Sequence, residues 1–181
     1  TMQFIKHPDI DTPRANRIVW RYMDLEKFLD LIVHSRLFFA NAANFTDGYE
    51  VSLPPDIVKA KRKRLEKDGF TGSNLEKELA TFELENDPQR ELTLVNCWSL
   101  GTKESYALWK IYLGGAKAGI AIRTNYGNVR DSICNGGDGM PEDFYAGVVK
   151  YQDFLVEKDL RRMRLVTTKR EFYKYEEELR L

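Results

Sequence analysis

The sequence is poor in the residues that most often bind metals or form disulfides. Among its 181 residues there are two cysteines and two histidines. Cys97 stands in an apolar run and Cys134 in a glycine-rich neighbourhood, at spacings that match neither a metal site nor a disulfide framework. We therefore expect no structural zinc site and no metal ligands in this chain.

Net charge and long hydrophobic runs are also missing. Lysine plus arginine equal aspartate plus glutamate at 28 each, so no overall field attracts nucleic acid or a membrane surface. No apolar run approaches the roughly 18 residues of a membrane span, and the amino end has no signal-peptide pattern. We therefore expect a cytoplasmic protein with no membrane partner.

The chain is rich in residues that build a core. Hydrophobic residues make up 43% of it and aromatic residues 12%, which excludes a disordered chain. A length of 181 residues suits one domain with a sizeable core. We predict a single domain over residues 1–181, with a helical insertion at 54–89.

Hydrophobic periodicity predicts an α+β fold, with a single mixed sheet, flanking helices and a charged two-helix insertion. Period-two alternation or β-branched runs predict strands at 17–22, 37–40, 90–98, 119–124, 146–151 and from 175 onward. Helical spacing predicts helices at 25–34, 56–68, 73–86, 104–113 and 126–134. Asp24 is the expected N-cap of the first helix, and Gly114 is expected to end the fourth.

The predicted insertion carries most of the clustered charge. Ser73 and Glu76 are spaced as a capping box for its second helix. Its first helix has six basic residues between Lys59 and Lys67, a pattern that suits either a solvated helix face or contact with phosphate. Because acidic residues lie nearby, we favour the solvated face and do not expect nucleic acid as a partner.

The stretch 94–112 is the place where a ligand site is expected. An apolar strand reaches Trp98 and Ser99, a short turn follows, and the next helix carries Trp109 and Tyr112 on one face. Apolar walls beside a few fixed polar groups suit a ligand, although the same pattern also builds an ordinary core. Trp98 and Ser99 must point to opposite faces of their strand, so only one of them can line a given site.

Several segments together resemble the bacterial domain-of-unknown-function family numbered 2971. They lie at 20–22, 37–39, 44–50, 96–99, 104–105, 108–109, 112, 119–122, 149–151 and 176–180. The resemblance runs from near residue 18 to the end and leaves out the charged helices. It implies an α+β domain of bacteria and phages, sometimes linked to phage-resistance loci, and no settled reaction.

A weaker similarity concerns ADP-ribosyltransferases, which place an Arg or His, a Ser and a Glu-x-Glu pair on successive strands around NAD. Arg21, Ser99, Glu176 and Glu178 occur in that order. The similarity implies that Arg21 orients the phosphates, Ser99 supports the ribose and the glutamates stabilise positive charge as nicotinamide leaves.

Aromatic side chains are the expected partners of the nicotinamide ring in this hypothesis. Tyr22 and Trp109 are the candidate stacking residues, with Trp98 as an alternative. The structural alternative for the acidic pair is that Arg180, on the same strand face, neutralises Glu178.

Asp47 and Glu50 are further candidates in the loop around Phe45 and Tyr49. As structural residues they would cap a turn, which Asp47 followed by Gly48 favours. As functional residues they would be acids, bases or ligand-orienting groups. We favour the structural interpretation.

Two functions therefore stand side by side. The first is a nucleotide-using transferase of ADP-ribosyltransferase type, with NAD as the candidate cofactor and a small nucleotide as partner. The second is a non-catalytic interaction module of a phage-defence or regulatory system, in which the aromatic surface receives a protein partner.

Overall fold

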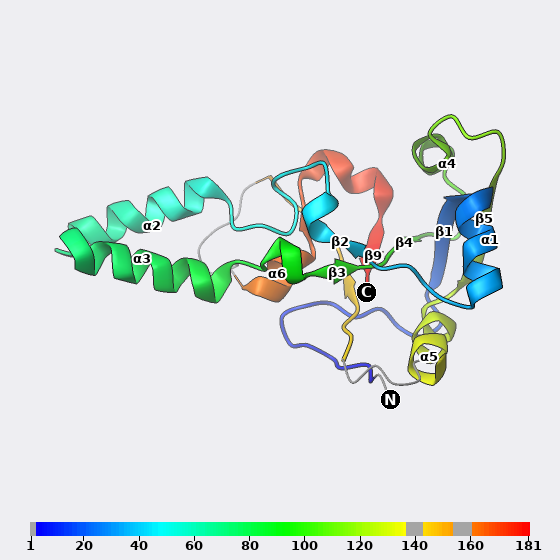
Figure 1. Ribbon diagram of the computed structural model, residues 1–181, viewed down its shortest axis with the longest axis horizontal. Helices are drawn as coiled ribbons and strands as arrows, with labels where there is room; N and C mark the ends of the chain where they lie inside the picture. The colour runs from blue at the N-terminus through cyan, green and yellow to red at the C-terminus, as the bar shows by residue number, and fades with distance from the viewer. Residues whose placement is uncertain (1–2, 137–142, 154–160) are drawn as a thin grey trace. The chain divides into compact units, whose positions relative to one another are not determined.

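The computed structural model describes residues 3–136, 143–153 and 161–181 (Figure 1). Its chain contacts divide into two compact units. Unit 1 comprises residues 1–40, 95–149 and 172–181, and unit 2 comprises 41–94 and 150–171. The α+β class predicted from the sequence is confirmed.

A five-stranded sheet forms the centre of unit 1. Its strands are β1 (Ile18–Asp24), β4 (Cys97–Leu100), β5 (Gly119–Asn125), β6 (Gly147–Val148) and β9 (Glu178–Arg180), in the order β5-β1-β4-β9-β6. Each neighbouring pair in this order is antiparallel. β1 and β5 pair along their whole length, from Ile18 opposite Asn125 to Asp24 opposite Gly119. β1 is therefore an interior strand, held on one side by β5 and on the other by β4.

Helices cover both faces of this sheet. α5 (Tyr126–Gly136) contributes Tyr126 and Val129 to a core that also holds Trp98 and Leu179. α4 (Tyr106–Leu113) packs on the opposite face, where Leu108 contacts the side chains of β1. The two faces are thus separate apolar layers.

The predicted helix ends of unit 1 are confirmed at two places. Asp24 caps α1 (Leu25–His34) because its Oδ1 accepts a hydrogen bond from Lys27 N at 2.8 Å. Gly114 ends α4 in the left-handed conformation, at φ 51°.

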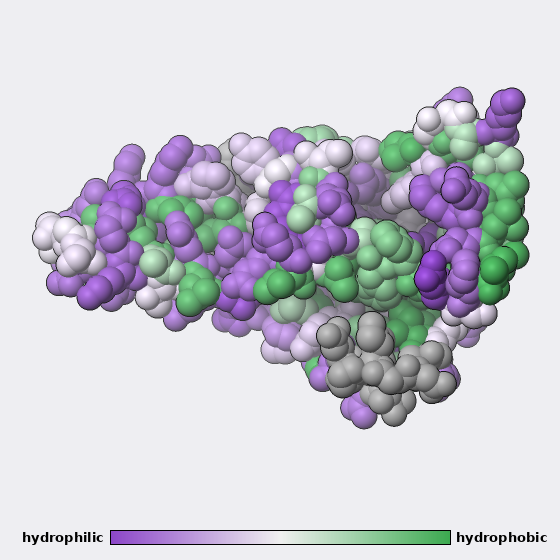
Figure 2. Space-filling model, in the orientation of Figure 1, coloured by the Kyte–Doolittle hydropathy of each residue, from purple (hydrophilic) through white to green (hydrophobic). Residues whose placement is uncertain are grey.

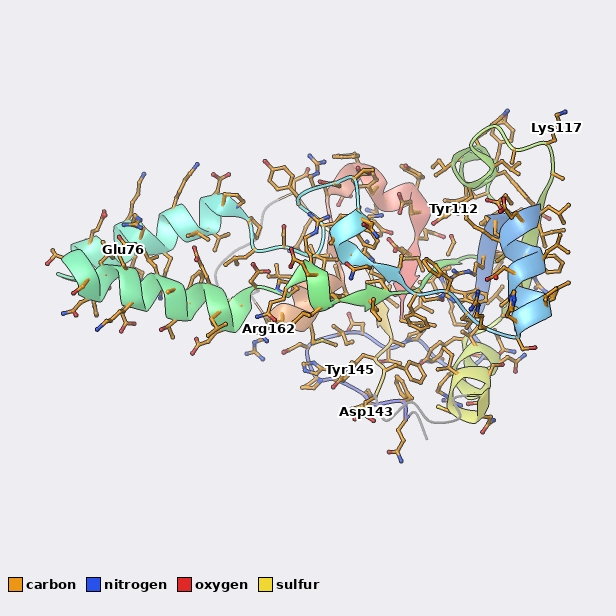
Figure 3. All side chains as sticks on the ribbon, in the orientation of Figure 1. Glu76, Tyr112, Lys117, Asp143, Tyr145 and Arg162 are labelled. Carbon is orange, nitrogen blue, oxygen red and sulfur yellow. The ribbon has the colours of Figure 1, made fainter. Side chains whose placement is uncertain are left out.

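Unit 2 contains the charged helical pair, α2 (Pro55–Lys67) and α3 (Gly72–Asn86), which lie side by side (Figure 1). Leu65, Leu75 and Leu79 form their shared core. The predicted capping box is wrong: α3 begins at Gly72 after Thr71, without a side-chain cap. Glu76, labelled in Figure 3, instead accepts two hydrogen bonds from Arg62 of α2, at 2.8 and 2.9 Å, and both side chains are exposed.

The remaining described elements of the chain are short. They are β2 (Ala40–Asn41), β3 (Leu94–Val95), β7 (Lys150–Tyr151), β8 (Thr168–Lys169), α6 (Arg162–Val166) and the 3-10 helices η1 (Ala42–Asn44), η2 (Arg90–Leu92) and η4 (Glu171–Glu176). β7 and β8 pair in parallel within unit 2. Among the described helices, none combines the length and hydrophobicity that crossing a bilayer requires.

Four predicted strands differ from the structure. The strand expected at 146–151 is divided into β6 and β7, which belong to different sheets. The stretch 90–98 begins as a 3-10 helix and then forms two short strands. The strand expected at 37–40 is reduced to two residues that begin at Ala40. The final strand begins at Glu178, because the preceding turns are 3-10 helical and Glu177 has a positive φ of 42°.

Candidate functional site

One row of side chains crosses three neighbouring strands of unit 1. Trp20 on β1 lies opposite Ser99 on β4, and Ser99 lies opposite Glu178 on β9. Residues paired in this way project to the same face of a sheet. Two of the predicted catalytic residues are therefore brought together, next to a tryptophan that the predictions did not include.

Glu178 is held by an arginine on its own strand. The Arg180 guanidinium donates hydrogen bonds to both carboxylate oxygens, from Nε at 2.9 Å and from a terminal nitrogen at 3.2 Å. Only 4% of Glu178 and 2% of Arg180 is exposed. The structural pairing considered for these two residues is thus present, and it fixes the orientation of the carboxylate.

Ser99 and Glu176 meet through the backbone of Glu176. The Ser99 hydroxyl donates a hydrogen bond to the carbonyl oxygen of Glu176 at 2.7 Å. Glu176 is half-buried at the end of η4, and the chain turns through Glu177 before β9 begins. Glu176, which the sequence suggested as a catalytic residue, therefore lies beside Ser99, but it is its main-chain carbonyl that Ser99 contacts.

Aromatic rings continue the same face toward α4. Trp20 stacks on Tyr22 with 6.3 Å between ring centroids, and Tyr22 stacks on Tyr112 at the same distance. Trp109 meets Tyr22 edge-on at 5.2 Å. We call these four residues the aromatic row; Figure 3 labels Tyr112, which projects from α4 toward β1. Its two members predicted to bind the cofactor, Tyr22 and Trp109, are in direct contact.

The polar atoms of the aromatic row are anchored within unit 1. Trp20 Nε1 donates to the Gly101 carbonyl at 3.1 Å, and the Tyr22 hydroxyl accepts from Ser105 N at 2.8 Å. Trp109 Nε1 donates to Glu104 Oε2 at 2.9 Å. Because the start of α4 is bonded to Tyr22, the helix and β1 hold the rings in a fixed arrangement.

Arg21 does not join this row. Successive residues of a strand project to opposite faces, so Arg21 leaves β1 on the face opposite Trp20 and Tyr22. Its guanidinium donates to the carbonyl oxygens of Cys97 at 3.1 Å and Phe38 at 3.4 Å, and lies 5.7 Å from the centre of the Trp98 ring. Burial lowers the pKa of Arg21 from its ordinary value.

This placement corrects the expected convergence of the arginine with the serine and the glutamate. A ligand lying against Ser99 and Glu178 is on the other side of the sheet from Arg21. Trp98, the alternative stacking residue, also belongs to that other side, where it is buried in the core with Leu179.

Arg123, unlike Arg21, places a positive charge on the face of the sheet that carries Trp20 and Ser99. It lies opposite Trp20 in the β1–β5 ladder, its guanidinium is 5.7 Å from the centre of the Trp20 ring, and it is exposed. The predictions missed it. The signal was present, because Arg123 is the charged residue that interrupts an otherwise apolar strand.

Asp47 and Glu50 belong to unit 2, where both form ion pairs. Asp47 accepts a hydrogen bond from Tyr49 N at 2.9 Å and two from Arg170, at 2.8 and 3.2 Å. Glu50 Oε1 lies 3.3 Å from Lys169 Nζ, and both side chains are buried. These contacts support the structural interpretation that we favoured for the two acids.

No group of three or more metal-binding side chains comes together within the described residues. Comparisons of the chain with models of protein families, with curated proteins and with solved structures found no match. The resemblances to family 2971 and to ADP-ribosyltransferases therefore stay hypotheses, and the chemistry of the site has to be argued from its geometry.

Proposed function

We propose that the face of unit 1 that carries Ser99 and Glu178 is the site of a nucleotide-using transferase of ADP-ribosyltransferase type, with NAD as its cofactor. The observation that carries the proposal is the row Trp20, Ser99 and Glu178. It places a hydroxyl and a carboxylate in register beside a set of stacked aromatic rings.

Each group has a role in the proposed reaction. The aromatic row offers ring faces for the nicotinamide or the adenine. Glu178 accepts a hydrogen bond from the ribose 2′-hydroxyl and stabilises the positive charge that develops as nicotinamide leaves. Ser99 and the adjoining Glu176 position the ribose, and Arg180 holds the carboxylate in one orientation.

Arg123 takes the role that the sequence assigned to Arg21. Its exposed guanidinium lies beside Trp20 on the same face as Ser99, where it can bind a phosphate with two parallel hydrogen bonds. Because only 4% of Glu178 is exposed, the ribose reaches the carboxylate only if the side chains that cover it move when NAD binds.

Binding is tested by titrating the purified protein with NAD while following its melting temperature and the heat released. We expect NAD to raise the melting temperature of the wild type, and Arg123→Gln to weaken binding about tenfold or more. Arg130→Gln is the matched control, because Arg130 pairs with its neighbour Asp131 at the surface of α5. Absence of NAD binding overturns the proposal.

Catalysis is tested separately by measuring nicotinamide release from NAD. Ser99→Ala removes one hydroxyl, and we expect it to lower the rate by about ten- to a thousandfold while the fold is kept. If NAD binds but the wild type releases no nicotinamide, the site binds nucleotides without cleaving them.

A non-catalytic interaction module of a phage-defence or regulatory system is the second candidate. It is favoured because both proposed catalytic groups already form hydrogen bonds within the chain. Glu178 accepts from Arg180, and Ser99 donates to the Glu176 carbonyl. Under this proposal a protein partner co-purifies with the wild type and is lost when Tyr112, which is partly exposed, is replaced by Ala.

A further inference from the structure

α1 presents the centre of its apolar surface to solvent. Leu25, Leu29, Ile32 and Val33 follow the spacing of one helix face, yet 43%, 47%, 52% and 71% of their respective surfaces are exposed. Figure 2 shows hydrophobic residues gathered over this region, along the right-hand edge of the view. A folded chain normally turns such a stripe inward.

The helix is attached to the sheet by one edge of its apolar surface. None of its residues is buried, whereas Phe28 and Leu31 are half-buried and the helix contacts β1 and β5. On a helical projection these two residues lie to one side of the stripe formed by Leu25 and Ile32. The exposed stripe is therefore left over after α1 has packed on its own sheet.

Four adjacent exposed aliphatic side chains amount to a patch on the order of a few hundred Å², the size at which a patch on a monomer usually marks an interaction site. Two of the charges near it differ in sign at the two ends of the helix, and the basic one, Arg36, pairs with Asp30 of its own chain at 2.9 Å. Glu26 lies in the first turn, and Arg36 follows the left-handed residue Ser35 that ends the helix. This asymmetry makes the surface complementary to itself when two copies run antiparallel.

We propose that two copies of this chain associate through α1, antiparallel about a two-fold axis between Leu29 and Ile32. In this register Leu29 of one copy packs against Ile32 of the other. Arg36 of one copy then reaches the turn that carries Leu25 and Glu26 of the other. A parallel pairing would bring the like ends of the helix dipoles together.

The size of the surface determines the strength of the association. α1 has ten residues and is therefore about 15 Å long. Its stripe is smaller than the roughly 800 Å² per partner of a standard stable interface. The proposal is therefore a weak dimer whose population depends on protein concentration.

Sedimentation velocity across about 5 to 500 µM protein tests the proposal, and we expect the mass to rise from monomer toward dimer within this range. Leu29→Glu and Val33→Glu each place a charge in the contact and should weaken dimerisation by at least about tenfold. Leu92→Glu is the control, because Leu92 is more exposed than Leu29 or Val33 but lies in unit 2. Far-UV circular dichroism confirms that each variant is folded.

A charge exchange tests the orientation of the two helices. It is made in an Asp30→Asn background, because Arg36 otherwise pairs with Asp30 of its own chain at 2.9 Å. In that background Glu26→Arg should weaken the dimer, and Glu26→Arg combined with Arg36→Glu should restore it. The proposal is overturned by a monomer at every concentration, by a dimer that Leu29→Glu and Val33→Glu leave intact, or by failure of the double exchange to restore association.

Discussion

Arg21 and Ser99 lie on neighbouring strands of one sheet, but their side chains leave it on opposite faces. Each is bonded where it lies: Arg21 to the carbonyl oxygens of Cys97 and Phe38, and Ser99 to that of Glu176. The sheet therefore separates an arginine with a structural role from the face on which a ligand would meet Ser99.

Replacing Arg21 by Ala should lower stability and leave nucleotide binding unchanged. The substitution removes two hydrogen bonds to carbonyl oxygens and the contact with Trp98, which together are worth about 2 kcal/mol. Urea denaturation measures the loss, and NAD titration at a temperature where the variant is folded measures affinity. A large loss of NAD affinity in the folded variant would place Arg21 at the site after all.

Replacing Arg180 by Ala should be more damaging, because it leaves the Glu178 carboxylate buried without its arginine. The expected loss in the free energy of unfolding is about 3–5 kcal/mol. The double variant Glu178→Leu with Arg180→Met removes both charges and should recover most of that loss. Equal destabilisation by the single and double variants in urea titrations would contradict a buried ion pair as the cause.

Tyr126 gives a prediction at high pH. Its hydroxyl is buried without a hydrogen-bond partner in the described part of the chain, and burial raises the pKa of Tyr126 to about 12. In the unfolded chain the Tyr126 hydroxyl ionises near pH 10. The stability that the neutral hydroxyl contributes is therefore fully present below pH 10 and is lost as the pH rises toward 12. The wild type should lose about 2–3 kcal/mol over this interval.

Tyr126→Phe should not show that loss, and at pH 7 it should be as stable as the wild type or slightly more stable, since it removes an unpaired buried hydroxyl. Thermal unfolding of both proteins at pH 7, 10 and 11 makes the comparison. Parallel pH profiles for the two proteins would assign the alkaline loss to other groups.

Arg90 should be the most important single side chain for the loop around η1. Its guanidinium donates to the carbonyl oxygens of Ala42 at 2.9 and 3.1 Å, Phe45 at 2.8 Å and Gly48 at 3.3 Å. Arg90→Ala should cost about 2–4 kcal/mol, and Arg90→Lys should restore little because an ammonium group cannot reproduce the planar fork.

Hydrogen exchange of the amides in residues 42–48 locates the effect of Arg90. As a comparison, Arg62→Ala removes the exposed bond to Glu76 and should change stability little, because solvent screens that pair. Faster exchange confined to other parts of unit 2 in Arg90→Ala would argue against this account.

Local patterns were sufficient to predict the elements with their own capping or periodicity. Asp24 with the apolar spacing of α1, and Gly114 at the end of α4, are examples in which residues close in sequence decide the structure. Alternation also predicted a strand from residue 175 onward, but the chain is 3-10 helical up to Glu176 and the strand begins at Glu178. Alternation in a short segment does not establish pairing, because a strand also needs a partner edge.

Which residues meet at the site depends on the register between strands that are distant in sequence. No short turn connects these strands, so the sequence does not determine that register locally. That Ser99 lies opposite both Trp20 and Glu178 follows from pairings across about 80 residues of sequence. The orientation of Arg21 could have been predicted from the sequence. Arg21 stands between Trp20 and Tyr22, so strand alternation implies that it faces away from both rings. Arg123 could have been found by the same reasoning once β5 was paired with β1.

The place of β9 in the sheet has a consequence for synthesis of the protein. β9 lies between β4 and β6, and unit 1 is assembled from three separate stretches of chain. As the chain leaves the ribosome, β4 therefore waits for about 80 residues with one hydrogen-bonding edge open to other chains. Chaperones that shield nascent strands should accordingly matter more for the yield of unit 1 than the stability of its finished sheet suggests.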